Sequence, residues 1–563
     1  MHLDRTKRDE GMALIVALIF LIVMGLTATF ASSRVMNNAR HIDKYVDYQN
    51  CFEGIESAFA QAQADFTAGG GGFVGVDPDY DFTQGLPNFG DPLVNPLVIP
   101  TSPQVQYFAY SIDWANDGID NNGDGQIDLG PEADGGYFST YAAARVIWNN
   151  NAPTAIRRAE RVLQGADINV WQNAIFAGAG QAGLLINGNV SIHGSVHLLG
   201  DSLGAGGVAL AAMDLSGTSL IHNNYEGLSA DARSRIPGLP TTDFDGDMGI
   251  DTLNATLRVK NGYVGMSGNS EVGEQHVAGN SFKETMDGVY VTDGWIGTSV
   301  DADGNPSNVY SDNGWDNEYD LGDMVAFPKY DNDGERNHLD YYLETDPDAS
   351  VGFQQVYTGD MIFTSGGESY YWNATTGVEV SEVAPGDGAM PLQADLNPDE
   401  FYVWFDADTN TMVINGRIAV DGDISFLSGI GQNDIINYEG KGTLLAFEGP
   451  GGGYGNIEVS VSLLAVVFPD NVIGLMAENA LNLGQTSQIE IMGAFYSEDT
   501  IDVDKQTNIV GTIVGQYFDM GGQVPAIYQV PSMSNAFSGS MRMIGSDPIL
   551  MMFPVSWREL AVL

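Results

Sequence analysis

The chain is poor in cysteine and in basic residues. Its 563 residues include a single cysteine, Cys51, so no disulfide can form within the chain. Lysine and arginine number 22 against 74 aspartates and glutamates, which gives a formal net charge of −52. A surface of that sign repels phosphate backbones and anionic lipids at long range, so DNA is an unexpected partner. Bound calcium and adaptation to high salt both explain the acidity, and the low share of lysine, 7 of the 22 basic residues, slightly favours salt adaptation.

The sequence also lacks recognisable catalytic motifs. None of its seven histidines belongs to an HExxH or a Ser-His-Asp arrangement. Pairs of carboxylates, which glycoside hydrolysis needs, arise by chance in a chain with 74 acidic residues. A lyase needs a basic side chain near its substrate, and the later strand segments offer few: Arg417, Lys441 and Lys505. We therefore predict that the protein is not an enzyme.

The long hydrophobic run of the chain lies near its start. Residues 12–31 carry no charge over 20 positions, enough to cross a hydrocarbon core of roughly 30 Å as a helix at about 1.5 Å per residue. Three basic residues precede the run: Arg5, Lys7 and Arg8. By the positive-inside rule the amino terminus stays in the cytoplasm and the rest of the chain crosses the inner membrane. Gly11 stands directly before the run, so cleavage between Gly11 and Met12 leaves the hydrophobic helix on the mature protein, unlike cleavage of a secretory signal peptide.

The helix is predicted to continue well beyond the hydrophobic run. Residues 32–66 contain no proline and one glycine, Gly54, and small or apolar residues recur at helical spacing until four glycines at 69–72. The Gly11 leader, the hydrophobic run and the segment QNCFEGIESAFAQAQ together resemble PilX-type minor type IV pilins with a class III prepilin signal. The resemblance implies cleavage by a prepilin peptidase, methylation of Met12 and assembly with other pilins. An ordinary signal anchor is the alternative.

One position departs from the pattern of major pilins. Those proteins carry a glutamate at the fifth mature position, where this chain has Val16. PilX-type pilins and the related minor pseudopilins of type II secretion commonly lack this glutamate. The resemblance therefore implies a rare subunit at the tip of a filament, and both a type IV pilus and a type II secretion pseudopilus are open.

The strongest metal-binding pattern is DWANDGIDNNGDGQIDLGPE at 113–132. Oxygen-bearing residues alternate around a glycine turn, an arrangement that suits calcium, which takes six to eight oxygens at about 2.4 Å. The predicted ligands are Asp117, Asp120, Asn122, Asp124, Gln126 through its carbonyl, Asp128 and Glu132. Because position 12 of an EF-hand loop is here Pro131 and flanking helices are not predicted, we expect a calcium loop between strands. A solvated acidic turn is the alternative.

Weaker acidic clusters are possible second metal sites. They are Asp243, Asp245, Asp247 and Asp251; Asp301, Asp303, Asn305 and Asp312; and Asp331 with Asp333. Each cluster is equally compatible with a surface turn in which Asp or Asn side chains bond to their own backbone.

Three segments that surround and follow the acidic loop are predicted strands: 105–113, 138–148 and 155–165. Their alternation suits a small antiparallel sheet packed on the stem helix. The closing segment at 551–560 resembles the last strand of PilX-type proteins, so we expect the chain to return to this sheet. Four arginines are interpreted as a sheet face paired with neighbouring carboxylates rather than a nucleic-acid site: Arg145, Arg157, Arg158 and Arg161.

A 13-residue pattern occurs twice, as INGNVSIHGSVHL at 186–198 and INGRIAVDGDISF at 414–426. Apolar residues alternate between glycine turns in both copies, which indicates rungs of a β-solenoid. Further rungs are predicted at 471–485, 487–504 and 507–520. Residues 200–410 are predicted to form long Asp/Asn/Gly-rich excursions. A sandwich of short antiparallel strands is the alternative.

Together these patterns predict an α+β pilin, with a long N-terminal helix and a small antiparallel sheet, carrying a large inserted all-β domain of β-solenoid type. The expected parts are a leader at 1–11, a transmembrane and stem helix at 12–66, a head with the calcium loop at 67–170, the solenoid at 171–530, and a returning segment at 531–563. The predicted function is a minor tip pilin that attaches to a surface or polymer ligand through a calcium-stabilised head. A ComZ-type component of DNA-uptake (competence) pili, similar in layout, and a signal-anchored surface β-helix enzyme are the alternatives.

Overall fold

The computed structural model describes most of the chain in separate stretches. They are 5–67, 73–77, 80, 87–113, 137–148, 152–167, 169–181, 189–200, 211–321, 325–329, 355–382, 385, 389–429, 434–449, 454–484, 488–520, 524–537 and 550–560. The chain forms two compact units, Met1–Ile168 with Ile549–Leu563, and Asn169–Pro548. The second unit is thus inserted in the first. The chain returns to the first unit at residue 549, later than the predicted 531.

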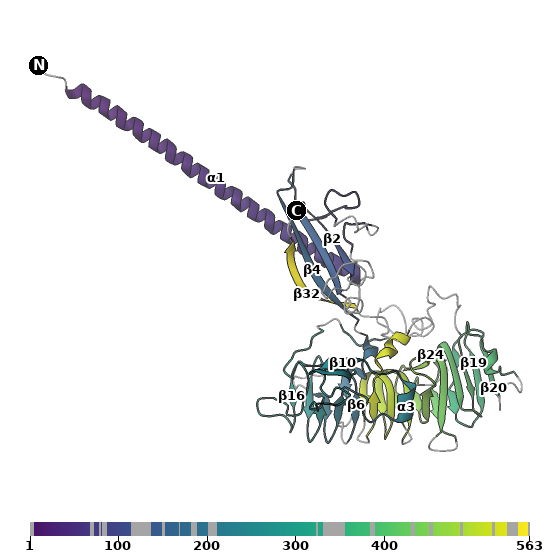
Figure 1. Ribbon diagram of the computed structural model, residues 1–563. Helices are drawn as coiled ribbons and strands as arrows, with labels where there is room; N and C mark the ends of the chain where they lie inside the picture. Colours follow the sequence, from purple (N-terminus) through teal and green to yellow (C-terminus); the bar gives the residue numbers. More distant parts are fainter. Residues whose placement is uncertain are drawn as a thin grey trace. The chain divides into compact units, whose positions relative to one another are not determined.

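The first unit is built on one long helix, α1 (Arg5–Thr67), which confirms the helix predicted over 12–66 (Figure 1). Its two halves differ, since residues 15–46 are all exposed while the second half contributes to a core. The buried apolar residues of α1 are Cys51, Ile55, Ala58, Phe59 and Ala62. Their spacing of mostly three and four residues places them on one face of the helix.

The buried half of α1 packs on a five-stranded antiparallel sheet. Its strands are β1 (Leu97–Ile99), β2 (Ser102–Asp113), β3 (Tyr137–Val146), β4 (Ala155–Asp167) and β32 (Leu550–Leu560), in the order β1-β2-β3-β4-β32. The three strands predicted around the acidic loop and the closing strand are confirmed. On β2, Val105 and Tyr107 join the core beneath α1, whereas Phe108 and Tyr110 join a second core on the opposite face. The period of two along the strand produces these two cores.

The second unit is rich in short strands. They are β5 (Ile175–Gln181), β6 (Ser191–His193), β7 (Val196–Leu198), β8 (Ala211–Leu215), β9 (Leu220–His222), β10 (Thr241–Phe244), β11 (Asp247–Asp251), β12 (Thr256–Val259), β13 (Tyr263–Met266), β14 (Glu271–Val272), β15 (Gly288–Val291), β16 (Trp295–Ile296), β17 (Tyr357–Thr358), β18 (Met361–Thr364), β19 (Ser369–Asn373), β20 (Val378–Glu382), β21 (Tyr402–Asp406), β22 (Thr411–Asp421), β23 (Ile424–Leu427), β24 (Ile435–Phe447), β25 (Ile457–Val459), β26 (Ser462–Ala465), β27 (Val472–Ala477), β28 (Leu481–Leu483), β29 (Glu490–Val503), β30 (Asn508–Asp519) and β31 (Ala526–Tyr528). Short helices are α3 (Ala230–Arg235), η3 (Val170–Gln172), η4 (Gln393–Asp395) and η5 (Pro531–Ala536). One hydrogen-bonded network joins 22 of these strands, and we call it the parallel stack.

Strands that follow one another along the chain lie side by side in the parallel stack. β22 pairs with β24, β24 with β27, β27 with β29 and β29 with β30, all in parallel. The segments 471–485, 487–504 and 507–520, predicted to contain strands, include β27, β29 and β30 of this parallel set. At one end, β19, β20 and β21 pair antiparallel instead.

The first and last strands of the second unit meet within the stack. β30 pairs in parallel with β5, so that Ile513 lies opposite Ile175, and β31 pairs with β6. From β5 the stack continues through β7, β12 and β15. Figure 1 shows this junction as yellow strands between teal and green ones. We call the contact between 169–195 and 507–530 the seam.

The described part of the first copy of the 13-residue pattern, 189–198, occupies a corner equivalent to that in the second copy. Gly194 separates β6 from β7, and Gly422 separates β22 from β23. At Gly194 the backbone φ is +133°, and a Cβ would lie 2.4 Å from Oε1 of Gln529. Glycine is therefore required there.

The prediction of long excursions is wrong for residues 211–321. This segment contains β8 to β16, and four of these strands, β9, β12, β14 and β15, belong to the parallel stack. These strands are two to five residues long. A segment of that length is too short to show a clear alternation of apolar and polar residues.

Side-chain acceptors connect neighbouring turns of the stack. Asp360 Oδ1 accepts the backbone N–H of Asp423 at 3.1 Å. Asp423 Oδ1 in turn accepts the N–H of Asn456 at 2.9 Å, and Asn456 Oδ1 accepts the N–H of Ala480 at 3.2 Å. Each side chain thus caps the backbone of the next turn, which fixes the register between turns.

Candidate functional site

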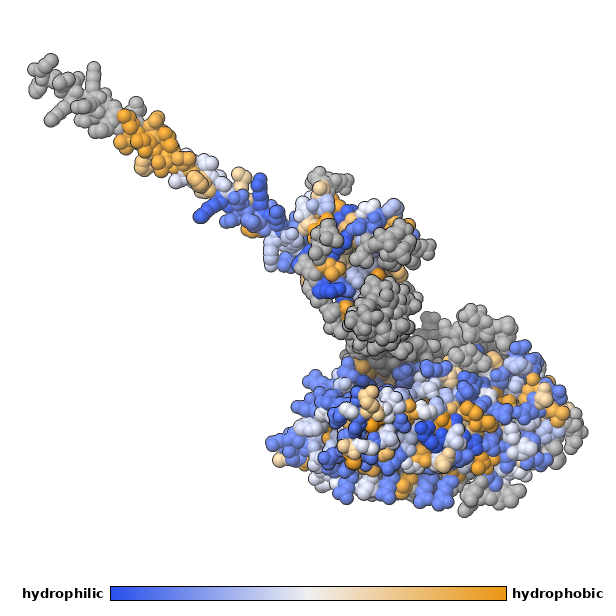
Figure 2. All heavy atoms as spheres, viewed as in Figure 1, coloured by the Kyte–Doolittle hydropathy of each residue, from blue (hydrophilic) through white to orange (hydrophobic). Residues whose placement is uncertain are grey.

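The exposed half of α1 is the surface whose chemistry most requires a partner. Residues 15–46 are exposed, and Figure 2 shows the apolar portion as an orange band. Among the described residues, one helix is long and apolar enough to cross a membrane, and it is α1. Thr27 Oγ1 donates to the Val23 carbonyl at 2.8 Å, and Thr29 Oγ1 donates to the Gly25 carbonyl at 2.7 Å. Both hydroxyl protons are satisfied within the helix, which suits surroundings of lipid or of other apolar helices.

The predicted cleavage site lies in the same helix. Gly11 and Met12 fall within the first turns of α1, and Val16 follows on its exposed apolar part, with 58% of its surface accessible. Cleavage between Gly11 and Met12 stays a prediction.

The second half of α1 is held on the sheet by close packing and by polar contacts. A Cβ at Gly54 would come within 2.7 Å of the Ala144 Cβ, so the helix approaches β3 more closely there than a side chain would allow. Asp47 is 7% exposed and accepts the indole N–H of Trp148 at 3.1 Å. These contacts were not predicted from the sequence. A glycine inside a helix otherwise rich in small residues is the signal that marks such a close approach.

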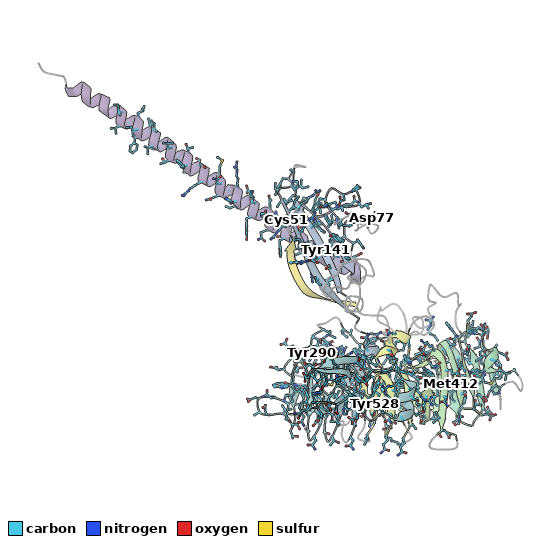
Figure 3. All side chains as sticks on the ribbon, viewed as in Figure 1. Cys51, Asp77, Tyr141, Tyr290, Met412 and Tyr528 are labelled. Carbon is cyan, nitrogen blue, oxygen red and sulfur yellow. The ribbon has the colours of Figure 1, made fainter. Side chains whose placement is uncertain are left out.

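Cys51 lies at the centre of this packing and is labelled in Figure 3. It is fully buried and has a free thiol. Burial raises the pKa of the Cys51 thiol to about 11. The thiol therefore stays protonated at neutral pH, and its role is packing rather than reactivity.

The four predicted arginines cover the sheet, as expected, but their main partners are aromatic rings and amides. The Arg157 guanidinium lies 5.8 Å from the ring centroid of Tyr48 and 5.9 Å from that of Phe52, both on α1. The corresponding contacts of the others are Arg145 with Phe89 and Gln106, Arg158 with Asn88, and Arg161 with Phe59. These cation–π and hydrogen-bond contacts occupy the arginines within the first unit.

The returning strand β32 is attached to β4 through a polar cluster. The Arg558 guanidinium donates to the Glu160 carboxylate, which also accepts the Ser139 hydroxyl at 3.0 Å. Glu160 is 4% exposed. The hydrogen bond to Glu160 raises the pKa of Arg558 above its ordinary value. A buried carboxylate needs such partners, so β32 adds both an edge strand to the sheet and the guanidinium that pairs with Glu160.

The predicted calcium ligands lie outside the described residues. This applies to all seven: Asp117, Asp120, Asn122, Asp124, Gln126, Asp128 and Glu132. The same is true of Asp331 and Asp333 among the possible second sites. In the part of the chain that the structure describes, no group of three or more His, Cys, Asp or Glu side chains could hold a metal ion.

The cluster at 243–251 forms a β-hairpin. Asp245 and Gly246 have φ values of +50° and +86°, as in the tight type I′ turn that connects two antiparallel strands. Asp243 and Asp251 lie on its two strands. Asp247 Oδ2 accepts the Gly279 N–H at 3.3 Å. The Asp-Gly pair is thus explained by the turn.

The cluster at 301–312 divides between two sets of partners. Asp301 Oδ1 accepts the backbone N–H groups of Asp303 and Asn305, both at 2.9 Å, which makes a self-capped turn. Asp312 instead accepts Lys283 Nζ at 2.7 Å. Because Lys283 neutralises Asp312, this carboxylate lacks the free charge that a cation site requires.

Comparisons with known proteins find similarity to solved structures. No protein-family model matches the chain, and no curated protein matches it. The crystal structure of the competence-associated pilin ComZ from Thermus thermophilus is similar to this chain with a TM-score of 0.43 and 16% sequence identity. The likeness covers 91% of this chain and 97% of that one.

Proposed function

We propose that the chain is a minor type IV pilin of PilX type. The observation that carries this proposal is that the two halves of the uninterrupted helix α1 have different surfaces. Its first half exposes an apolar surface, and its second half forms the core of an antiparallel sheet. Such a helix can be anchored in the inner membrane before assembly and can pack among the helices of other pilins afterwards, while the sheet remains folded throughout.

The second unit is then the part that the filament displays. In this proposal the parallel stack is the β-solenoid expected from the repeat, stabilised by its paired backbone and by the side-chain bonds between turns. The unit is inserted between β4 and β32, so both of its ends continue along the chain into strands of the pilin sheet. A head of this size serves attachment to a surface or a polymer ligand outside the cell. The role is structural and adhesive, without catalysis.

Tip placement is proposed from Val16. The terminal amine of a pilin in an apolar filament core needs a carboxylate from a neighbouring subunit, and Val16 offers none. An unpaired charge in such surroundings costs several kcal/mol. The subunit is therefore best placed where no other subunit lies ahead of it. Immunogold labelling at filament ends supports this placement, and even labelling along the filament contradicts it.

Calcium binding by the loop at 113–132 belongs to the same proposal. Asp120, Asp124 and Asp128 place three carboxylates within nine residues, and their mutual repulsion opens the loop unless a cation is bound. Millimolar extracellular calcium is sufficient even for a weak site.

The proposal is tested by processing. We expect the mature protein from sheared filaments to begin at Met12, with an N-methyl group, after cleavage by the prepilin peptidase. Gly11→Leu is expected to leave the full-length precursor in the inner membrane, whereas Gly25→Leu, in the same helix, is expected to be cleaved normally. Recovery of residues 1–11 on protein outside the cell would refute the pilin assignment and favour a signal anchor.

A component of a DNA-uptake pilus is the second candidate. The net charge of −52 argues against direct contact with DNA. An electrophoretic mobility assay with and without calcium separates the two candidates, because a DNA-uptake component that binds DNA shifts the band in at least one condition.

A further inference from the structure

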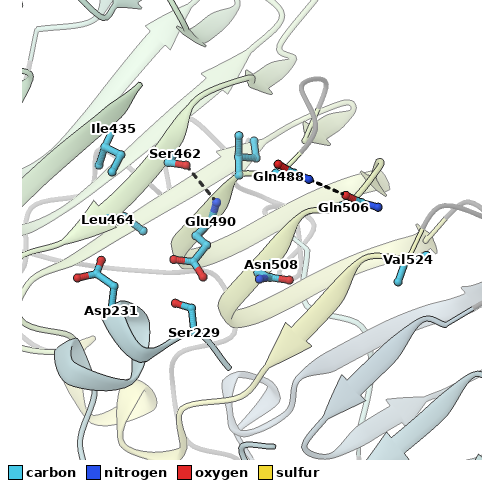
Figure 4. Close-up of a pocket in the computed structure, with 11 residues that line it drawn as sticks. Ser229, Asp231, Ile435, Ser462, Leu464, Gln488, Glu490, Gln506, Asn508 and Val524 are labelled. Atoms are coloured by element: carbon cyan, nitrogen blue, oxygen red, sulfur yellow. Dashed lines mark hydrogen bonds between the residues drawn. The ribbon is translucent and has the colours of Figure 1, made fainter. Parts of the chain in front are cut away.

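A groove of about 710 Å³ crosses the parallel stack beside α3 (Figure 4). Its floor comes from strands β24, β26, β29 and β30 and from residues that directly precede strands. Ser229 and Asp231, at the start of α3, form one wall. All of these residues belong to the second unit.

The floor repeats the same chemistry from one strand to the next. Leu463 lies opposite Ile491, and Glu490 lies opposite Asn508, so Ser462, Glu490 and Asn508 occupy one column across three adjacent strands. Adjacent strands are about 4.8 Å apart. Gln488 and Gln506 form a second column, in which Gln488 Nε2 donates to Gln506 Oε1 at 3.3 Å. Figure 4 shows both columns at the groove.

The wall is fixed before any ligand arrives. Arg235, at the end of α3, donates to the Ala465 carbonyl at 2.7 Å and to Asn437 Oδ1 at 3.2 Å. Its own carbonyl accepts the Phe468 N–H at 2.7 Å. On the other side of α3, Tyr225 donates to the Gln529 carbonyl at 2.8 Å. A site held this way loses little conformational entropy on binding.

The polar lining groups are amides, hydroxyls and carboxylates, the other lining residues are aliphatic, and the lining contains no lysine, arginine, histidine or aromatic ring. Asp231 pairs with Arg235 at 3.0 Å. Within the described part of the chain, no hydrogen bond reaches the Glu490 carboxylate or the Asn508 side chain. The groove therefore presents free acceptors and donors in repeated positions, and Ile435 and Val524, 39% and 38% exposed, add apolar surface.

These features exclude two classes of linear ligand. Single-stranded nucleic acid requires basic side chains and stacking rings, and neither lines the groove. An extended peptide that adds a strand requires unpaired backbone groups, but β29 at the groove is already paired with β26 on one side and with β30 on the other. Recognition in this groove must come from side chains.

We propose that the groove binds a neutral, hydroxyl-rich polymer, a neutral polysaccharide, with its chain running across successive strands. The Glu490 carboxylate accepts from ring hydroxyls, and the amides of Gln488, Gln506 and Asn508 both donate and accept. Ile435 and Val524 contact the apolar faces of the sugar rings. This inference rests on the proposed function only in taking the second unit to be displayed outside the cell.

The test uses the full chain in detergent and measures binding by isothermal titration calorimetry. The probes are neutral hexasaccharides of glucose, mannose, galactose and xylose, with oligogalacturonate and single-stranded DNA as charged comparisons. We expect at least one neutral hexasaccharide to bind and both anionic probes to fail. Glu490→Ala combined with Gln506→Ala is expected to weaken binding tenfold or more. Asn482→Ala, on β28 and outside the groove, is expected to change it less than twofold.

Three outcomes would overturn the inference: no binding by any neutral hexasaccharide, stronger binding by an anionic probe, or an equal loss in Asn482→Ala. Unchanged melting of the variant that combines Glu490→Ala with Gln506→Ala separates loss of binding from loss of folding. Cleavage at Gly11 is measured independently. A processed pilin without hexasaccharide binding refutes this inference alone, and hexasaccharide binding by an unprocessed protein refutes the pilin assignment alone.

Discussion

Gln529→Met is expected to destabilise the second unit at its seam. Gln529 is 3% exposed and joins the two ends of the unit with both atoms of its amide. Its Oε1 accepts the backbone N–H of Ser195 at 2.7 Å, and its Nε2 donates to the Gln172 carbonyl at 2.6 Å. The partners are 334 and 357 residues away in sequence. Methionine has a similar length and keeps the packing while removing both bonds.

The expected cost follows from the environment of each partner. Each lost hydrogen bond is worth about 1 kcal/mol, and the buried Ser195 N–H left without an acceptor adds about 1–3 kcal/mol. Gln172 is exposed, so water can replace the bond to its carbonyl. We therefore expect a loss of about 2–4 kcal/mol in the free energy of unfolding of the second unit. Gln393→Met, at an exposed glutamine bonded to Glu439, is the control, with an expected cost below about 0.5 kcal/mol.

Hydrogen–deuterium exchange of the full chain in detergent is the appropriate measurement, because it resolves the unfolding free energy by segment. In Gln529→Met, amides of both β5 and β30 should lose protection together, since each strand is the neighbour of the other. Strands β18 and β23, at the far end of the stack, should change less. Loss of protection confined to β30, or a cost no larger than that of the control, would refute the argument that Gln529 joins the two ends.

Three further predictions address pH, helix packing and calcium. Burial, with smaller effects from two nearby cations, lowers the pKa of His197 to about 3 from 6.5. The contribution of neutral His197 to the free energy of unfolding is therefore complete above pH 6.5 and falls by about 2 kcal/mol on acidification to pH 5. Urea unfolding at the two pH values should show this loss, and His197→Gln should show a smaller one. Gly54→Ala should lower the melting temperature of the first unit because its Cβ meets Ala144 at 2.7 Å, whereas Gly25→Ala, with nothing within 4 Å, should not; equal effects would contradict the packing argument. EDTA should lower the melting temperature of the full chain, and Asp124→Ala should reproduce most of that loss, since calcium at a hundredfold excess over Kd stabilises by about 2.7 kcal/mol. A melting temperature unchanged by EDTA but raised by monovalent salt would assign the acidity to salt adaptation.

The elements that the sequence predicted are those with a long, locally visible period. The helix α1 runs for 63 residues without proline, and its periodic apolar face belongs to one uninterrupted segment. The strands β2, β4 and β32 have 11 to 13 residues each, long enough for apolar and polar positions to alternate several times. The small antiparallel sheet was predicted from that alternation, and the return of β32 to it from the closing motif.

Short strands could not be predicted in the same way, because contacts between turns define them. Asn223 illustrates the difficulty, since its Oδ1 accepts the N–H of Ala255 at 2.8 Å, 32 residues further along the chain. Asp293 Oδ2 likewise accepts the N–H of Gly262 at 2.7 Å. Each bond fixes a turn of the stack, but a single sequence contains no mark that pairs these two positions. The sequence of 211–321 therefore has the composition of an irregular loop, although the segment forms strands in the folded protein.

The groove was missed for a related reason, although the sequence does contain a signal for it. Gln488-Ile489-Glu490 and Gln506-Thr507-Asn508 are 18 residues apart, and Val524 stands a further 18 residues on. That spacing is the length of one turn in this part of the stack, since Glu490 lies opposite Asn508 and Asn508 opposite Ala526. Polar residues that recur at this turn length, instead of at the strand period of two, pair Glu490 with Asn508 and Gln488 with Gln506. Ser462, 28 residues before Glu490, does not follow the spacing.

The acidic motifs also have a different explanation in the described part of the chain than their composition indicates. Asp245 makes a hairpin turn, Asp301 caps its own loop, and Asp423 bonds to the backbone of the next turn. In the last two cases a carboxylate accepts backbone N–H groups, which is enough to account for an aspartate beside a glycine without any metal. The proposal of calcium therefore depends on the loop at 113–132 alone, where the alternation of ligands extends over nine positions and exceeds what a single turn requires. Chelation should accordingly act on the first unit and leave exchange of the parallel stack unchanged.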